Sequence, residues 1–202
     1  MIKTVYVIEG AFLSSVHRIF KDRGILVIDD PRLADAIVWT GGGDVDPSAY
    51  GESNTHSYSS PELDAWEKKF YDNFPGKKRI GICRGGQLLN VWNGGSMWQD
   101  IQFHRGNHLI RDHRDNGDRM VMVSSLHHQM MRPTFDAEVL ATCKITSLVR
   151  GGDQEKRRIN EDYDDIEAVF YPKTRSLCYQ PHPECGPKSC TDHFFDLIEA
   201  KL

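Results

Sequence analysis

The chain has 202 residues, of which 27% are charged and 39% are hydrophobic, and its formal net charge is −4. This length suits one domain, spanning residues 1–202, whose core is large enough to fold without disulfides or structural metals. The mildly acidic balance argues against a protein that binds nucleic acid or an anionic membrane through a basic surface.

The 5 cysteines are an odd number. None lies in a CxxC pair, so a fully paired disulfide framework is excluded and a zinc ribbon is disfavoured. No apolar run reaches the roughly 18 residues of a membrane span, and the N-terminal apolar run is too short for a signal peptide. We therefore expect a cytoplasmic protein with reduced thiols that does not bind a membrane.

Short apolar strands alternate with amphipathic helices through the first half of the chain. The pattern predicts strands over 5–8, 25–28, 36–40 and 79–82, and helices over 11–23, 62–73 and 85–92. Gly24 is expected at a left-handed helix C-cap. This order of elements predicts an α/β fold, a three-layer sandwich with helices on both faces of a mostly parallel central sheet.

The second half of the chain has a weaker pattern. It predicts strands over 120–123, 137–144, 166–171 and 176–180, and a C-terminal helix over 191–202. Residues 102–119 mix histidines with arginines and aspartates and offer little core. Residues 151–165 are highly charged, which is typical of a solvated loop.

The segment GICRGGQ at 81–87 places a cysteine between a buried strand and a helix. Small residues on both sides allow the sharp turn of a nucleophile elbow, with Gly81 and Gly85 providing clearance. Cys83 would then lie at a helix N-terminus, where the helix dipole favours a thiolate. The alternative is that Cys83 is only a buried cysteine at the end of a strand.

A base for such a nucleophile stands late in the chain, in the segment HPE at 182–184. It follows a predicted strand, as Cys83 does, and sites in open α/β sheets lie at the carboxyl ends of strands. His182 can accept the thiol proton, and Glu184 can orient the imidazole.

These segments, with the glycine-rich loop TGGGDVDP at 40–47, resemble a class I glutamine amidotransferase domain with its flavodoxin-like fold, most closely the γ-glutamyl hydrolase branch that includes γ-glutamyl-γ-aminobutyrate hydrolases. Further segments carry the same resemblance: YGE at 50–52, Asp64 with Glu67, LLNV at 88–91, GGS at 94–96, QDI at 99–101 and SLHHQ at 125–129.

The resemblance implies a thiol hydrolase with a Cys83–His182–Glu184 triad. Cys83 would attack a γ-glutamyl amide to form a thioester, His182 would protonate the leaving amine, and water would release glutamate. The backbone N–H groups of Arg84 and Gly43 would form the oxyanion hole.

The resemblance also implies a set of residues that bind the glutamyl group: Gly42, Gln87, Ser125, His127, His128 and Gln129. An exposed polar turn is the alternative for His127 and His128. His127 is also an alternative base, although it has no neighbouring carboxylate like Glu184.

We expect no cofactor and no metal. His104 and His108 have i, i+4 spacing, but Gly106 disfavours a helix there and no third ligand has convincing spacing. Cys185 and Cys190 are either unreactive thiols or a redox pair.

The favoured function is hydrolysis of γ-glutamyl amide bonds, in glutamine or in a γ-glutamyl conjugate of an amine or amino acid. One alternative is a glutaminase subunit that supplies ammonia to a separate synthetase or ligase. Another is a non-catalytic binding protein on the same scaffold. The expected partner is therefore a small γ-glutamyl molecule, with a synthetase or ligase partner and a homo-oligomer left open.

Overall fold

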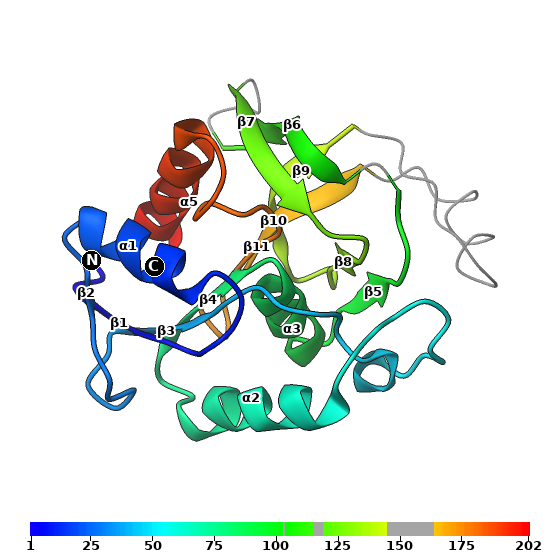
Figure 1. Cartoon of the computed structure of the whole chain (residues 1–202), viewed down its shortest axis with the longest axis horizontal. Helices are drawn as coiled ribbons and strands as arrows, with labels where there is room; N and C mark the ends of the chain where they lie inside the picture. Colours follow the sequence, from blue (N-terminus) through cyan, green and yellow to red (C-terminus); the bar gives the residue numbers. More distant parts are fainter. Residues whose placement is uncertain (103, 115–118, 145–163) are drawn as a thin grey trace.

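The structure is a computed structural model that describes residues 1–102, 104–114, 119–144 and 164–202. Figure 1 shows the helices, which are α1 (Leu13–Asp22), α2 (Pro61–Asn73), α3 (Arg84–Trp92), α5 (Lys188–Lys201) and the short 3-10 helix η1 (Pro47–Tyr50). The strands are β1 (Thr4–Val7), β2 (Leu26–Val27), β3 (Ala36–Trp39), β4 (Lys78–Ile82), β5 (Ser96–Trp98), β6 (Arg105–Asp112), β7 (Arg119–Leu126), β8 (Met130–Arg132), β9 (Glu138–Cys143), β10 (Asp165–Tyr171) and β11 (Ser176–Tyr179).

A central sheet organises the molecule, with strand order β2-β1-β3-β4-β11-β10-β9-β6-β7. Neighbouring strands are parallel from β2 to β11. The sheet then continues through antiparallel pairs from β11 to β7, while β5 and β8 pair separately. β10 and β11 pair antiparallel because a tight turn joins them, without the helix that a parallel crossover needs. The predicted α/β class is confirmed.

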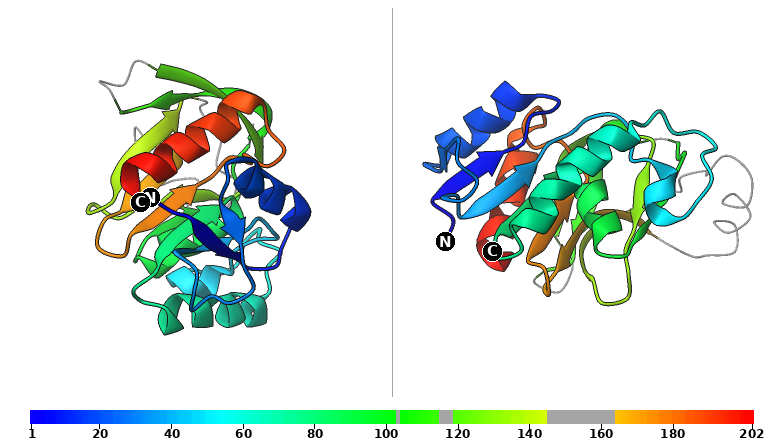
Figure 2. Two further views of the ribbon diagram at one scale, coloured as in Figure 1. Left: turned by 90° about the vertical axis from the view of Figure 1, so that its left-hand side faces the viewer. Right: turned by 90° about the horizontal axis from the view of Figure 1, so that it is seen from below.

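Helices cover both faces of the parallel strands, as Figure 2 shows. Ala36 and Val38 of β3 belong to one core cluster with α1 and α5. Ile37 and Trp39 belong to the opposite cluster with α2 and α3. Burial on both faces explains why this strand is a continuous apolar run rather than an alternating one.

The predicted elements of the first half are confirmed with small shifts at their ends, and Gly24 has the expected left-handed conformation, with φ 73°. No strand is predicted over 102–119, yet this segment contains the eight-residue strand β6. Its inward positions include His108 and Asp112 beside Ile110, so polar side chains hide the alternation that marks a strand. Most of the predicted loop at 151–165 lies outside the described residues.

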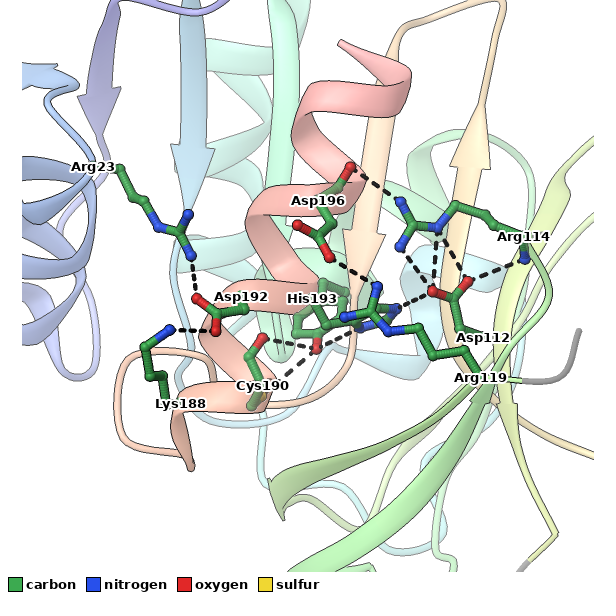
Figure 3. Close-up of polar contacts among 10 residues, drawn as sticks. Arg23, Asp112, Arg114, Arg119, Lys188, Cys190, Asp192, His193 and Asp196 are labelled. Carbon is green, nitrogen blue, oxygen red and sulfur yellow. Dashed lines mark hydrogen bonds and ion pairs between the residues drawn. The ribbon is translucent and has the colours of Figure 1, made fainter.

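Helix α5 is tied to the antiparallel extension by charged contacts, drawn in Figure 3. Arg114 binds both carboxylate oxygens of the buried Asp112, and its Nη2–Oδ2 distance is 2.7 Å. His193 of α5 faces the same carboxylate, with Nε2 at 3.4 Å from Oδ2. Arg119 of β7 pairs with Asp196 of α5 at 2.9 Å. These contacts hold β6 and β7 against the helix that follows the HPE segment.

None of the five cysteines lies in a disulfide in this structure, and Cys185 is the exposed one. Cys143 and Cys178 lie in strands, where the sequence pattern places them. Within the described part of the chain, no helix has the length and apolar character needed to cross a bilayer.

Candidate active site

The sequence-predicted site residues come together where three neighbouring parallel strands end. Strands β3, β4 and β11 are adjacent in the sheet, so their carboxyl ends meet at one edge. The glycine loop follows β3, Cys83 follows β4, and Gln180 with the HPE segment follows β11.

Cys83 has the backbone conformation of a nucleophile elbow, with φ 51° and ψ −113°. Its N–H donates to the Tyr179 carbonyl at 2.8 Å, and its carbonyl accepts from the Gln87 N–H at 3.0 Å. A non-glycine residue in this region of backbone space is strained by about 1–3 kcal/mol. Strand β4 on one side and helix α3 on the other hold the residue in this conformation.

The glycines beside Cys83 are required by close backbone contacts. A Cβ atom on Gly81 would lie 2.4 Å from the Gly85 carbonyl oxygen. A Cβ atom on Gly85 would lie 2.2 Å from the carbonyl oxygen of Trp39. These distances explain why the turn from strand to helix needs small residues, as the sequence pattern indicates.

His182 lies between Cys83 and Glu184. Its Nδ1 is 2.6 Å from Oε1 of Glu184. Its interaction with Cys83, like that with Glu184, favours the charged imidazole. Burial opposes charging of the imidazole, but the contacts with Cys83 and Glu184 outweigh it and raise the pKa of His182 to about 11. All three side chains are buried. The arrangement can hold and transfer a proton at Cys83 while Glu184 orients the ring.

Backbone contacts with the antiparallel extension fix the position of His182. Its N–H donates to the Ser124 carbonyl at 3.1 Å, and its own carbonyl accepts from Ser124 Oγ at 3.0 Å. Phe12 covers the imidazole edge-on, with ring centroids 5.6 Å apart. The helical pattern places Phe12 in the core, but it precedes α1 with φ 58° and is 45% exposed. Sequence reasoning therefore missed its position at the site.

Gly41 forms a wall of the site. A Cβ atom on this residue would lie 3.2 Å from Cε1 of His182 and 3.8 Å from Cβ of Cys83. A larger residue would therefore fill the space beside the thiol.

The two glycines that follow carry predicted roles in binding and in the oxyanion hole. A Cβ atom on Gly42 would lie 3.1 Å from the Arg84 side chain, and one on Gly43 would lie 3.4 Å from the Tyr58 carbonyl oxygen. Both glycines are exposed. The N–H of Arg84 is the first of helix α3, so no carbonyl within the helix accepts from it.

The side chain of Arg84 lies beneath the glycine loop and is held by helix α2. Its Nη1 pairs with Glu67 at 2.7 Å and its Nη2 pairs with Asp64, and all three side chains are buried. This ion-pair cluster connects α2 to the first residue of α3. Asp64 and Glu67 therefore position Arg84, whereas the sequence alone linked these two residues only to the family resemblance.

Gln87 and Gln180 form a buried pair beside Cys83. Nε2 of Gln87 donates to the Gln129 carbonyl at 3.0 Å and to Oε1 of Gln180 at 3.2 Å. Nε2 of Gln180 lies 3.9 Å from Sγ of Cys83. Sequence reasoning missed Gln180, although its position directly after β11 is the signal that could have found it.

The SLHHQ segment contacts the same region mainly through structural hydrogen bonds. The Gln129 side chain clamps the glycine loop, since Oε1 accepts from the Val45 N–H at 2.9 Å and Nε2 donates to the Val45 carbonyl at 3.1 Å. His128 is part-buried and pairs with Asp44 at 2.9 Å. Ser125 contacts Nδ1 of His108 at 3.3 Å.

His127 is buried, and its Nδ1 donates to the Gln129 carbonyl at 2.9 Å. Burial lowers the pKa of His127 to about 3. The ring packs against His104, with centroids 4.9 Å apart. The structure thus places His127 in a buried histidine cluster and His182 beside the thiol.

Comparison with known proteins identifies the family of the chain. The model of the peptidase C26 family matches residues 31–184. The glutamine amidotransferase-like protein YvdE of Lactococcus lactis subsp. lactis (strain IL1403) is 29% identical over 184 residues, which cover 80% of this chain and 70% of that protein.

Solved structures show the same fold. A glutamine amidotransferase from Thermotoga maritima has a TM-score of 0.60 at 16% identity, with 100% of this chain and 86% of that chain covered. A protein named as a GMP synthase subunit from Thermoplasma acidophilum has a TM-score of 0.65 at 15% identity, with 99% and 96% covered. The family match spans the glycine loop, Cys83 and the HPE segment. The chain belongs to the peptidase C26 family, within the class I glutamine amidotransferase-like superfamily.

Proposed function

We propose that this chain hydrolyses γ-glutamyl amide bonds, with Cys83 as the nucleophile. The observation that carries the proposal is the strained elbow at Cys83, with φ 51°, which lies beside a histidine held by Glu184. Strain of this kind at a buried thiol beside a histidine is typical of a nucleophile rather than of a structural cysteine.

The reaction follows from this geometry in two steps. The Cys83 thiol gives its proton to His182 and its sulfur bonds to the amide carbon. The carbon–nitrogen bond then breaks, and the leaving nitrogen takes that proton from His182. Water then gives a proton to His182, its oxygen bonds to the carbonyl carbon, and the carbon–sulfur bond breaks to release glutamate. The backbone N–H of Arg84 and an amide of the glycine loop, with Gly43 as the predicted donor, would stabilise the oxyanion. Loss of one such donor costs about 10²–10³ in kcat.

The glutamyl group would lie between the exposed glycine loop and Gln87. Gln87 and the SLHHQ segment are the predicted contacts for its amino and carboxylate groups, and Gly42 is a further predicted substrate contact. His128 is the member of that segment with a part-exposed side chain beside the glycine loop.

The test is a glutamate-release assay over glutamine and a panel of γ-glutamyl amines. Cys83→Ala should abolish release while leaving the urea unfolding midpoint close to that of the native chain. A glutamine-analogue electrophile should modify Cys83, detected by mass spectrometry in a Cys185→Ser background that removes the exposed thiol. Activity that persists in Cys83→Ala would refute the mechanism, and an intact thiol would favour a non-catalytic binding protein.

A glutaminase that supplies ammonia to a separate synthetase is the second candidate. It is favoured by the fold similarity to the GMP synthase protein of Thermoplasma acidophilum. Under this alternative, glutamine alone would be turned over, weakly, and the rate would rise when the synthetase is added. Release of a larger amine from a γ-glutamyl conjugate, without any partner, would support the stand-alone hydrolase.

A further inference from the structure

A second cluster of titratable side chains lies behind the Cys83 site. His104, His127 and Glu167 each offer one ligand atom, and the three atoms lie within 4.8 Å of one another. Their side chains are 0%, 7% and 0% exposed, so water cannot satisfy them freely.

Three buried atoms of this cluster have no hydrogen-bond partner in the described part of the chain: His104 Nδ1, His127 Nε2 and Glu167 Oε2. An unpartnered buried polar atom costs about 1–3 kcal/mol. Three of them on three converging residues therefore require an explanation.

The contacts of His127 fix the direction of its lone pair. A carbonyl oxygen can only accept, so Nδ1 carries the proton that is donated to Gln129 at 2.9 Å. In the neutral ring, Nε2 then presents an unshared electron pair to the cluster. This is how proteins orient a metal-binding histidine: one nitrogen is held by an outer acceptor and the other faces the ion.

His104 has the same arrangement with the two nitrogens exchanged. Its Nε2 lies 3.0 Å from Oδ2 of Asp165, and its Nδ1 lies 3.3 Å from Oε1 of Glu167 without the alignment of a hydrogen bond. A nitrogen lone pair and a carboxylate oxygen that face each other repel, unless a cation or a proton lies between the two atoms. His108 holds Oε1 of Glu167 from the other side, at 3.2 Å.

Two explanations compete for this cluster. A doubly protonated His104 between Asp165 and Glu167 would account for its Nδ1, but it would leave His127 Nε2 and Glu167 Oε2 without partners. One bound cation accounts for all three atoms. We propose that His104, His127 and Glu167 bind a divalent transition-metal ion, with Zn²⁺ favoured by the two imidazoles and one carboxylate.

A surface pocket adjoins the cluster on one side. This pocket, of about 820 Å³, is lined by His104 and His127 together with Tyr58 and Asp100. Three protein ligands leave a coordination position for water or a small anion. The proposal rests on burial and contacts, so it stands whether or not the chain hydrolyses γ-glutamyl amides.

Metal binding by the full chain tests the proposal. After removal of metals with a chelator, we expect one Zn²⁺ per chain in competition with a chromophoric chelator, and a zinc-dependent rise in Tm. His127→Gln and Glu167→Gln should each weaken binding by more than about 100-fold, beyond the 10–100-fold typical of an outer-shell loss. Asp165→Asn should fall within that outer-shell range.

His56→Gln is the matched control, because His56 lines the same pocket but is exposed and outside the cluster. It should bind Zn²⁺ like the native chain. Far-UV circular dichroism identifies variants that fail to fold. If the variants do not fold, the visible spectrum of the Co²⁺-loaded native chain tests which ligands bind the ion. Co²⁺ bands of a nitrogen–oxygen site are expected. A sulfur-to-metal charge-transfer band would indicate that the ion is bound by His108, Cys143 and Glu167 instead, and would overturn the ligand assignment. Absence of zinc binding, or equal binding by Glu167→Gln, would overturn the site.

Discussion

The backbone strain at Cys83 should lower the free energy of unfolding relative to a chain with glycine at that position. This effect can be measured without any substrate. The comparison is between Cys83→Gly and Cys83→Ala, both of which lack the thiol. Alanine keeps the Cβ atom and therefore keeps the strain of φ 51° and ψ −113°. Glycine adopts this conformation freely.

The magnitude follows from two opposing contributions. Relief of the strain favours glycine by about 1–3 kcal/mol. The greater freedom of glycine in the unfolded chain favours alanine by about 0.5–1 kcal/mol. We therefore expect the free energy of unfolding of Cys83→Gly to exceed that of Cys83→Ala by about 1 kcal/mol, within a range of about 0–2.5 kcal/mol.

Urea unfolding gives both free energies, provided that the m-values agree. Ala65 supplies the control, since it is an exposed residue inside α2 with ordinary helical surroundings. There Ala65→Gly should lose about 1 kcal/mol, the normal preference in a helix. If alanine is also the more stable residue at position 83, Cys83 is not strained, and the main support for its role as a nucleophile is lost.

Three further predictions concern other contacts. His182 has a pKa raised to about 11, so its contribution to stability is fully present below its unfolded pKa of about 6.5 and is lost as the pH rises toward 11. Glu184→Gln should lower that pKa in an NMR titration and reduce the loss of unfolding free energy between about pH 7 and pH 10; an unchanged titration would contradict the pairing. Gly85→Ala should destabilise the fold by about 1–3 kcal/mol in urea, although alanine is the better helix former, because its Cβ would overlap the backbone of β3; a gain in stability would contradict this. Burial opposes ionisation of Asp112, but its histidine and arginine partners hold its pKa well below its usual range. Asp112→Asn should therefore lose about 3 kcal/mol at neutral pH, and the difference from the native chain should shrink as the pH falls below about 4, since this stability is present above the unfolded pKa and lost in acid. A pH-independent difference in thermal unfolding would refute that assignment.

The parallel half of the sheet and the elbow could be predicted because their signals are local. Buried strands such as β3 are continuous apolar runs, and the turn at Cys83 needs glycine within two residues on either side. The position of His182 could be predicted for the same reason, since it directly follows a strand. Each of these inferences needs only a few consecutive residues and the rule that sites lie at strand ends.

The antiparallel half could not be predicted in the same way, because its inward positions are polar. In and beside β6, His104, His108 and Asp112 lie on the face that an apolar pattern would otherwise mark. The i, i+4 spacing of the two histidines was weighed only against a helix, which Gly106 disfavours, whereas a strand also brings residues i and i+4 to one side. Their partner Glu167 is on β10, so only the pairing of distant strands reveals the cluster.

The Cys83 site and the histidine cluster share the β10–β11 hairpin. The Gln180 N–H donates to the Glu167 carbonyl at 2.8 Å, while the Gln180 side chain reaches toward Cys83. A buried ionic cluster is weak evidence for stability, because well-packed apolar residues in its place are often neutral or stabilising by about 1–4 kcal/mol. The polar residues at Glu167 and its neighbours are therefore better explained by a bound ion beside the thiol site than by a need of the fold.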